Sequence, residues 1–218
     1  MRKLKEYLKK PLSFVMLLLI IISTVITALT VVFIIGYILI KGVPNLSPQL
    51  FSLKYSSSNQ SMLPSIINTV YLTALTLILA VPIGIFSAIY LAEYSRKNSL
   101  FVKIINVANE TLSGIPSIVY GLFGFLAFVI SKKWGYSLLA GVITLAIMVL
   151  PLIIRTSQEA MLGVDNSFRE ASYGLGAGKL RTVFKIVLPS AMPGILSGII
   201  LAIGRIVGTM GYNDYLQR

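Results

Sequence analysis

The chain has 218 residues, of which 56% are hydrophobic and only 12% are charged, whereas typical soluble domains are roughly 25% charged. It contains no cysteine and no histidine, which excludes disulfide frameworks, thiolate or imidazole metal sites and any histidine-dependent general base. The formal charge is +12, but the cations lie between long apolar runs, so the composition indicates a multi-pass membrane protein and argues against nucleic acid as a partner.

Five apolar runs are long enough for membrane-spanning helices, each of which needs roughly 20 residues to cross a hydrocarbon core about 30 Å thick. Helices are expected because lipid cannot satisfy backbone polar groups, and the alternation of a barrel strand is missing from these runs. The predicted fold is therefore all-α, a polytopic transmembrane helical bundle. Its spans are predicted at residues 12–40, 63–92, 111–130, 137–156 and 189–208.

The first run follows a basic segment, residues 1–11, that has the charge pattern of a signal-peptide start. The run is 29 residues long and has no A-x-A cleavage pattern, so it is predicted to be an uncleaved first span. With the N-terminus inside, thirteen of the 19 Lys and Arg residues lie in inner segments and four lie in outer segments. The positive-inside rule therefore predicts a cytoplasmic N-terminus and a cytoplasmic loop at residues 157–188.

The inner loop 157–188 is the most informative stretch of the sequence. Residues 165–167 offer helix N-caps, and Ser167-Phe168-Arg169-Glu170 has the spacing of a capping box. A short helix is predicted from Phe168 to Leu175, with a small-residue face and glycines that can end it at 174, 176 or 178. A second helix, residues 180–188, is predicted to stop at Pro189. The small face is equally consistent with docking into a groove of a partner and with a solvated hairpin.

Residues 174–179 have a superficial likeness to a phosphate-binding P-loop. The required pattern is G-x-x-x-x-G-K-[ST] after a strand, but Tyr173 occupies the first glycine position and Leu180 replaces Ser or Thr. We therefore expect no cofactor bound directly to this chain, and no ATP hydrolysis by it.

The same loop resembles the Glu-Ala-Ala loop of ABC-importer permeases. The matching residues are Glu170-Ala171-Ser172, then Gly176, and then Ile186-Val187-Leu188-Pro189 after nine further residues, with Ser172 in place of the second Ala. Three more segments are similar to phosphate permeases, namely Gly114–Gly124, Ile89–Tyr94 and Leu188–Ile195. The combination is more like the PstA-type subunit than its PstC-type partner, from about residue 10 to Gly208.

The resemblance implies a type I ABC-importer permease fold in a bacterial or archaeal plasma membrane. It implies a second permease subunit of the PstC type, two ATPase subunits that use ATP, an extracytoplasmic phosphate-binding protein and surrounding membrane lipid. The ATPase-coupling loop would comprise Glu170, Ala171, Ser172, Gly176, Ile186, Leu188 and Pro189. The expected function is thus ATP-driven import of inorganic phosphate, with a permease for another oxyanion or polar solute, or less favourably a membrane-embedded enzyme, as alternatives.

Arg205 is the most conspicuous charge within a predicted span. A charge in lipid is costly, so Arg205 either faces a cavity or partner or extends to the outer headgroups. Its planar fork of donors suits an oxyanion, and the resemblance places an Arg at this position on the substrate path. Glu110 is predicted to be an ordinary charge at a helix end.

Span three contains Gly114, Pro116, Gly121 and Gly124, which are expected to let it bend and pack closely against a neighbour. Related permeases continue after the position of Gly208 with a Glu-Thr pair and a sixth span. Residues 209–218 diverge from that pattern, so the sequence is expected to be a C-terminally truncated form of a longer permease.

Overall fold

The computed structural model describes residues 11–45, 47–53, 61–95 and 99–216, and every regular element assigned within these ranges is a helix. The basic N-terminal residues 1–10, Lys54, Arg96 and Lys97, which contribute to the predicted charge bias, lie outside the described residues. The chain divides into two compact units, residues 1–64 and 65–218.

The first unit contains the long helix α2 (Pro11–Gly42) and two short 3-10 turns, η1 (Val43–Asn45) and η2 (Pro48–Phe51). α2 covers the first predicted span and is apolar apart from Ser, Thr and Gly until Lys41. The hydroxyls of Thr24, Thr27 and Thr30 each donate to the carbonyl four residues earlier at 2.8 Å. These polar groups therefore satisfy themselves within the helix, as a lipid environment requires.

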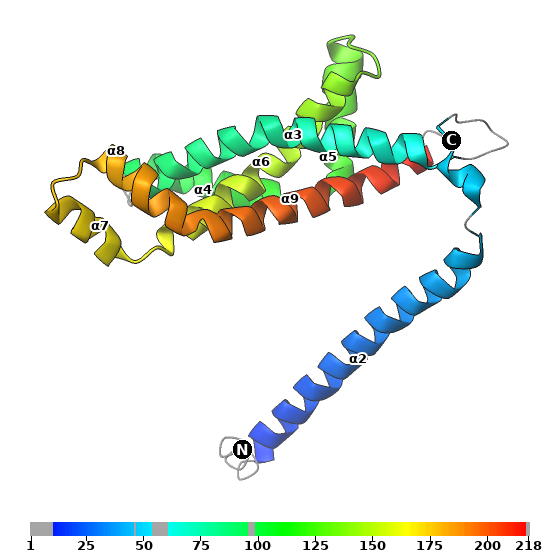
Figure 1. Ribbon diagram of the computed structural model, residues 1–218, viewed down its shortest axis with the longest axis horizontal. Coiled ribbons are helices and arrows are strands. Elements are labelled where there is room, and N and C mark those ends of the chain that lie inside the picture. Colours follow the sequence, from blue (N-terminus) through cyan, green and yellow to red (C-terminus); the bar gives the residue numbers. More distant parts are fainter. Residues whose placement is uncertain (1–10, 46, 54–60, 96–98, 217–218) are drawn as a thin grey trace. The chain divides into compact units, whose positions relative to one another are not determined.

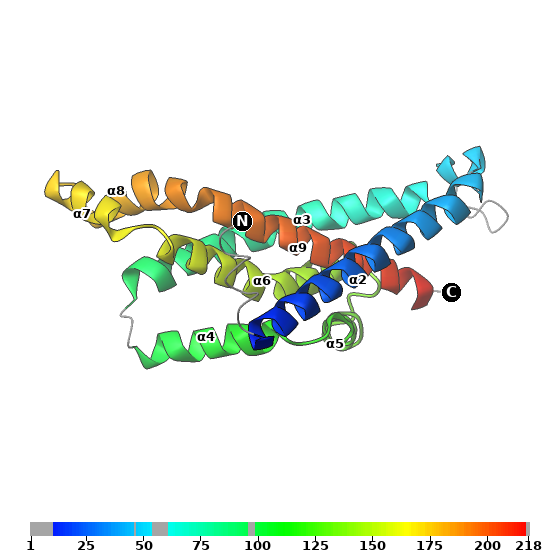
Figure 2. The same cartoon turned by 90° about the horizontal axis from the view of Figure 1, so that it is seen from below.

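The second unit is a bundle in which α6 (Leu138–Leu162) packs against α9 (Leu188–Leu216), and α3 (Leu63–Ile89) meets this pair at Ala80 and Gly84 (Figure 1, Figure 2). α3 continues into a π-helical turn, η3 (Tyr90–Tyr94). The loop helices α7 (Asn166–Gly174) and α8 (Lys179–Thr182) lie at one end, and a second π-helical turn, η5 (Val183–Val187), joins α8 to α9. α9 includes residues 209–216, which were expected to be a divergent tail.

Within the described residues, four helices are long and apolar enough to cross a membrane, and a bent helix pair raises the number to five if it forms one span. That pair differs in extent from the third span predicted at residues 111–130, and its bend lies where Gly114 and Pro116 were expected to allow one. It consists of α4 (Leu100–Ser113), α5 (Ser117–Gly124) and the π-helical turn η4 (Phe125–Ser131), with a bend of 98° at residues 114–116. Pro116 explains the break, because proline disfavours helical angles at the preceding residue and cannot donate a backbone hydrogen bond.

Close contacts through small residues hold the bundle together. A Cβ atom built on Gly84 would lie 2.6 Å from Cγ2 of Ile153, and one on Gly194 would lie 2.7 Å from Cβ of Ala160. Gly198 and Gly124 approach Thr156 and Thr144 in the same way. Small residues matter here because helices in lipid associate through van der Waals packing, which requires close approach of the backbones.

The buried apolar residues form two main clusters along the bundle. One joins α3, α5, α6 and α9 and comprises Ala80, Tyr120, Leu145, Ala146, Met148, Val149, Ile153, Ala202 and Ile206. The other lies beside the loop and comprises Ile89, Met161, Val183, Val187, Ala191 and Ile195. The loop helices are therefore attached to a packed end of the bundle.

Candidate coupling loop and intramembrane arginine

The first loop helix, α7, begins because Asp165 caps it. The carboxylate accepts a hydrogen bond from the backbone N–H of Ser167 at 2.8 Å, and α7 starts at Asn166. The backbone hydrogen bond from Ser167, followed by that from its hydroxyl, lowers the pKa of Asp165 below its ordinary value of 3.8. The predicted capping box at Ser167 is wrong, because the helix starts earlier and places Glu170 beyond the first turn.

The helix ends at Gly174 and is terminated by the left-handed Gly176, one of the three glycines predicted to allow this. Gly176 has a φ of +77°, a backbone angle that L side chains rarely adopt. Its N–H bonds the carbonyl of Tyr173 at 2.9 Å, and the N–H of Ala177 bonds the carbonyl of Ser172 at 3.1 Å. This pair of bonds is the Schellman arrangement, which satisfies the last carbonyls of a helix.

The two loop helices are joined by a buried pair of hydroxyls. The Oγ of Ser172 lies 2.8 Å from Oγ1 of Thr182, and these residues are 4% and 0% exposed. Ser172 stands where the resembled motif has Ala, so this departure supplies an interhelical hydrogen bond. Glu170 and Ala171 are exposed on α7.

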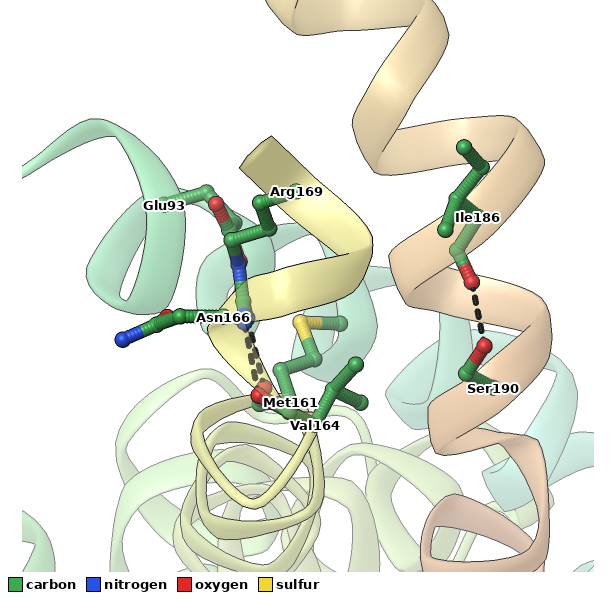
Figure 3. A network of polar contacts seen from close by, with 7 residues as sticks. All are labelled: Glu93, Met161, Val164, Asn166, Arg169, Ile186 and Ser190. Carbon is green, nitrogen blue, oxygen red and sulfur yellow. Dashed lines mark hydrogen bonds and ion pairs between the residues drawn. The ribbon is translucent and has the colours of Figure 1, made fainter. Parts of the chain in front are cut away.

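The second loop helix does not stop at Pro189, contrary to the prediction. Helical structure continues from Lys179 through α8, η5 and α9, so Ile186, Leu188 and Pro189 lie within one helical run. The N–H of Leu188 bonds the carbonyl of Val183, five residues earlier. This wider turn next to Pro189 accommodates a residue that lacks an N–H, and the Ser190 hydroxyl donates to the carbonyl of Ile186 at 2.7 Å (Figure 3).

Arg169 forms the most extensive polar contact of the loop, which the sequence did not reveal. Its Nη2 and Nε lie 2.7 and 3.0 Å from Oε1 of Glu93, on the π-helical turn that ends α3 (Figure 3). Its Nη2 and Nη1 also donate to the carbonyls of Met161 at 2.8 Å and Val164 at 2.7 Å. Breaking a buried pair of this kind typically costs about 3–5 kcal/mol, because one charge is left uncompensated.

Arg205 contacts the break between α4 and α5. The alternative in which its side chain extends to the outer headgroups would not require this contact. Its Nη2 lies 3.2 Å from the carbonyl oxygen of Ile115 and 3.4 Å from that of Ser113. The guanidinium therefore meets carbonyls that the interrupted helix leaves without their usual N–H donors. The negative end of the α4 dipole favours a cation there.

Two side chains of α4 carry buried polar atoms near the end that Arg205 contacts. Asn109 and Ser113 are four residues apart, and neither the Asn109 amide nitrogen nor the Ser113 hydroxyl has a hydrogen-bond partner within the described part of the chain. Buried polar groups are normally paired, so these two donors are available for a further polar contact.

The four residues predicted to shape span three have different surroundings. Gly114 and Pro116 lie at the 98° bend. A Cβ on Gly124 would collide with Thr144, whereas one on Gly121 would meet nothing within 4 Å. Close packing is therefore confined to Gly124.

Glu110, predicted to be a helix-end charge, lies near the end of α4. Its Oε1 is 4.0 Å from Nη1 of Arg155, and the two side chains are 75% and 48% exposed. An exposed pair of this kind contributes little to stability.

Comparison with known families decides the identity of this architecture. Residues 80–211 match the family described as the binding-protein-dependent transport system inner membrane component. The chain belongs to this family. The match includes the last ten residues of α3, the α4–α5 break, the loop helices and Arg205.

Several relatives are phosphate permeases. The chain is 34% identical to the phosphate transport system permease protein PstA of Haemophilus influenzae, over 95% of this chain and 73% of that protein. It is 44% identical to PstA of Yersinia pestis, over 60% of this chain and 44% of that protein. It is 35% identical to a probable ABC transporter permease protein, YqgI, of Bacillus subtilis, over 79% of this chain and 59% of that protein.

These matches confirm the resemblance to PstA-type ABC-importer permeases and the multi-pass membrane fold. A member of this family is a transport component. The chain spans between about two fifths and three quarters of the length of these relatives.

Proposed function

We propose that this chain is the membrane-spanning permease subunit of an ATP-driven importer of inorganic phosphate. The observation that carries the proposal is the likeness to PstA of Haemophilus influenzae over 95% of the chain. In this proposal the chain pairs with a second permease subunit of the PstC type and with two ATPase subunits that bind and hydrolyse ATP. An extracytoplasmic phosphate-binding protein delivers the substrate from the opposite face.

The loop at residues 157–188 is proposed to be the cytoplasmic contact with the ATPase, which places the N-terminus on the same side. Support comes from α7, a nine-residue helix capped at both ends that lies at the tip of the bundle. Glu170, Ala171 and Gly176 are assigned to this contact, with Ser172 holding α7 to α8 from its buried side. Ile186, Leu188 and Pro189 carry the displacement into α9.

Arg205 is proposed to contact phosphate on its path through the bundle. A guanidinium in a membrane span costs about 2.5–3.5 kcal/mol at the helix centre on insertion scales, so it needs compensating contacts. The two carbonyl contacts use one of its nitrogens, Nη2, and the Asn109 amide and Ser113 hydroxyl add donors on the adjacent helix. These groups together supply donors for a multiply charged oxyanion that must bind weakly enough to be released.

The test is uptake of labelled phosphate by vesicles that contain this chain with its second permease, its ATPase and its binding protein. We expect ATP-dependent uptake that excess unlabelled phosphate suppresses and excess sulfate does not. Uptake of another solute in place of phosphate would refute the substrate assignment. ATP-independent turnover of a lipid or peptide would refute transport itself.

The role of Arg205 is tested in the same vesicles. We expect Arg205→Ala to abolish uptake, and Arg205→Lys, which keeps the charge but loses the planar fork, to retain a part of it. Arg155→Ala removes a half-exposed arginine of α6 and serves as the matched control. Undiminished uptake by an assembled Arg205→Ala complex would remove Arg205 from the path.

A further inference from the structure

The end of α3 is contacted by both arms of the loop. Arg169 of α7 binds the carboxylate of Glu93 through two nitrogens, at 2.7 and 3.0 Å. The ammonium of Lys179, the first residue of α8, lies 4.8 Å from the ring centroid of the adjacent Tyr94. Two neighbouring residues of η3 are therefore each contacted by a cationic side chain from a different loop helix. This site, Glu93 with Tyr94, is called the α3 clamp below.

Burial separates the clamp from the other ion pairs of the described residues. The side chains of Arg169 and Glu93 are 12% and 7% exposed, whereas those of Arg155 and Glu159 are 48% and 63% exposed. An exposed pair is screened by solvent and holds its partners loosely. A buried guanidinium with several acceptors fixes both distance and angle.

Arg169 also makes the clamp a junction of three elements. Besides Glu93 on η3, its guanidinium binds the carbonyls of Met161 in the last turn of α6 and Val164 after it. Within α7 it contacts Oδ1 of Asn166 at 3.2 Å. Figure 3 shows these groups gathered around one side chain. A displacement of α7 therefore acts directly on α3. It also acts on α6 and α8, to which α7 is joined through the chain.

The two helices of the loop are joined to each other by a buried contact. The Ser172 and Thr182 hydroxyls lie 2.8 Å apart in a buried contact between α7 and α8. The two cations that reach the clamp are thus carried by a single hairpin. Apolar packing alone allows neighbouring helices to slide, but an ion pair in which two guanidinium nitrogens meet one carboxylate oxygen, with further carbonyl contacts, resists this.

We propose that Arg169 and Glu93 are positioning residues that transmit displacement of the loop to α3, so that α3 moves with the loop when nucleotide binds the partner ATPase. This inference rests on the proposed function, since it assigns a route for the ATPase-driven motion. The π-helical form of η3 fits this role, because π-helical turns occur frequently at functional positions of helices.

The test compares matched exchanges in the reconstituted importer. Arg169→Lys keeps the charge but replaces the three nitrogens that contact Glu93, Met161 and Val164 by a single one on a shorter side chain, and Arg155→Lys is the same exchange in an exposed pair. Glu93→Gln and Glu159→Gln form a second matched set. A charge-reversed double variant is unsuitable, because a carboxylate at position 169 would face the carbonyls of Met161 and Val164.

The first readout is the phosphate transported for each ATP hydrolysed by assembled complexes. We expect this ratio to fall at least about fivefold in Arg169→Lys and Glu93→Gln, the lower end of effects for an ordinary coupling free energy, and to stay unchanged in both controls. An unchanged ratio in assembled Arg169→Lys and Glu93→Gln complexes would overturn the proposal. Failure of both variants to assemble would assign the pair to folding and overturn it as well.

The second readout is independent of the substrate. The chain has no cysteine, so spin labels can be placed at exposed Phe86 on α3 and Ser167 on α7 without removing other thiols. We expect the distance between the labels to be the same with and without nucleotide in the unaltered chain, and to change with nucleotide in Arg169→Lys. A constant distance in Arg169→Lys would overturn the clamp. A wild-type complex that shows the expected distances but transports no phosphate would refute the proposed function and leave the clamp standing.

Discussion

The contact between α6 and α9 yields a sharp prediction for Gly198→Ala. A Cβ atom at position 198 would lie 2.7 Å from Cβ of Thr156, and closer still to its hydroxyl oxygen. Rotation of Thr156 cannot relieve the contact between the two Cβ atoms. The Thr156 hydroxyl is also held by the carbonyl of Leu152 at 2.9 Å. The helices themselves must therefore separate locally.

The size of the effect follows from that separation. An ordinary contact begins at 3.4 Å, so α9 must move away from α6 by about 0.7 Å at this point. A gap of 0.5–1 Å forfeits roughly a quarter to a half of the dispersion energy of each contact affected. Overpacking of this kind typically costs about 1–3 kcal/mol. We expect Gly198→Ala to lower the free energy of unfolding by an amount in that range.

The assay is unfolding of the purified chain in mixed micelles by increasing fractions of dodecyl sulfate. Gly204→Ala is the matched control, because a Cβ there meets nothing within 4 Å on the same helix. Thr156→Gly removes the opposing Cβ and should restore much of the stability lost in Gly198→Ala, which a double-mutant cycle measures. Equal stability of Gly198→Ala, Gly204→Ala and the unaltered chain would refute the packing described for α6 and α9.

Two further predictions concern the ends of α7. Because its capping hydrogen bonds lower the pKa of Asp165, its contribution to helix stability is fully present above pH 3.8 and is lost as pH falls through the lowered value. Hydrogen exchange across α7, corrected for intrinsic rates, should accelerate as the pH falls through this lowered pKa. Asp165→Asn keeps a hydrogen-bond acceptor without the charge and should show no such transition. We expect Gly176→Val to fray α7 and to uncouple transport, because Gly176 has a φ of +77° and left-handed angles cost other residues about 1–2 kcal/mol. Gly174→Val is the control, since a Cβ at position 174 meets nothing within 4 Å. Equal hydrogen exchange and equal transport in the two variants would contradict the prediction.

Much of the fold could be predicted because a lipid environment allows few backbone structures. Long apolar runs must be helical, so α2, α3, α6 and α9 follow from length and hydropathy. The bend at Pro116 could not be found by counting apolar residues, since both sides of it are apolar. The local rule for the residue before a proline does favour a break there. At Pro189 the same kind of rule gave a wrong prediction, because a π-helical turn before the proline allows the helix to continue.

The candidate site was predictable where it depends on local chemistry. Asp165 and Gly176 are short-range signals, and each acts within a few residues of its position. The contact between Glu93 and Arg169 joins residues 76 positions apart, and no periodicity connects them. Its only signals in the sequence are an acidic and a basic residue, each of which is expected to lie near the end of a span. The packing of α3 against the loop determines that they meet.

The two arginines contact backbone carbonyls in the same way, although they lie in different parts of the bundle. Arg205 binds carbonyls where α4 is interrupted, and Arg169 binds carbonyls where α6 ends. Each cation therefore lies at the negative end of a helix and satisfies acceptors that lack N–H donors. They differ in the anion that completes the contact. Arg169 has the carboxylate of Glu93 built into the chain, which suits a permanent mechanical link. Arg205 has carbonyls as its acceptors within the described residues, and in the proposed function the transported oxyanion supplies the negative charge and then leaves.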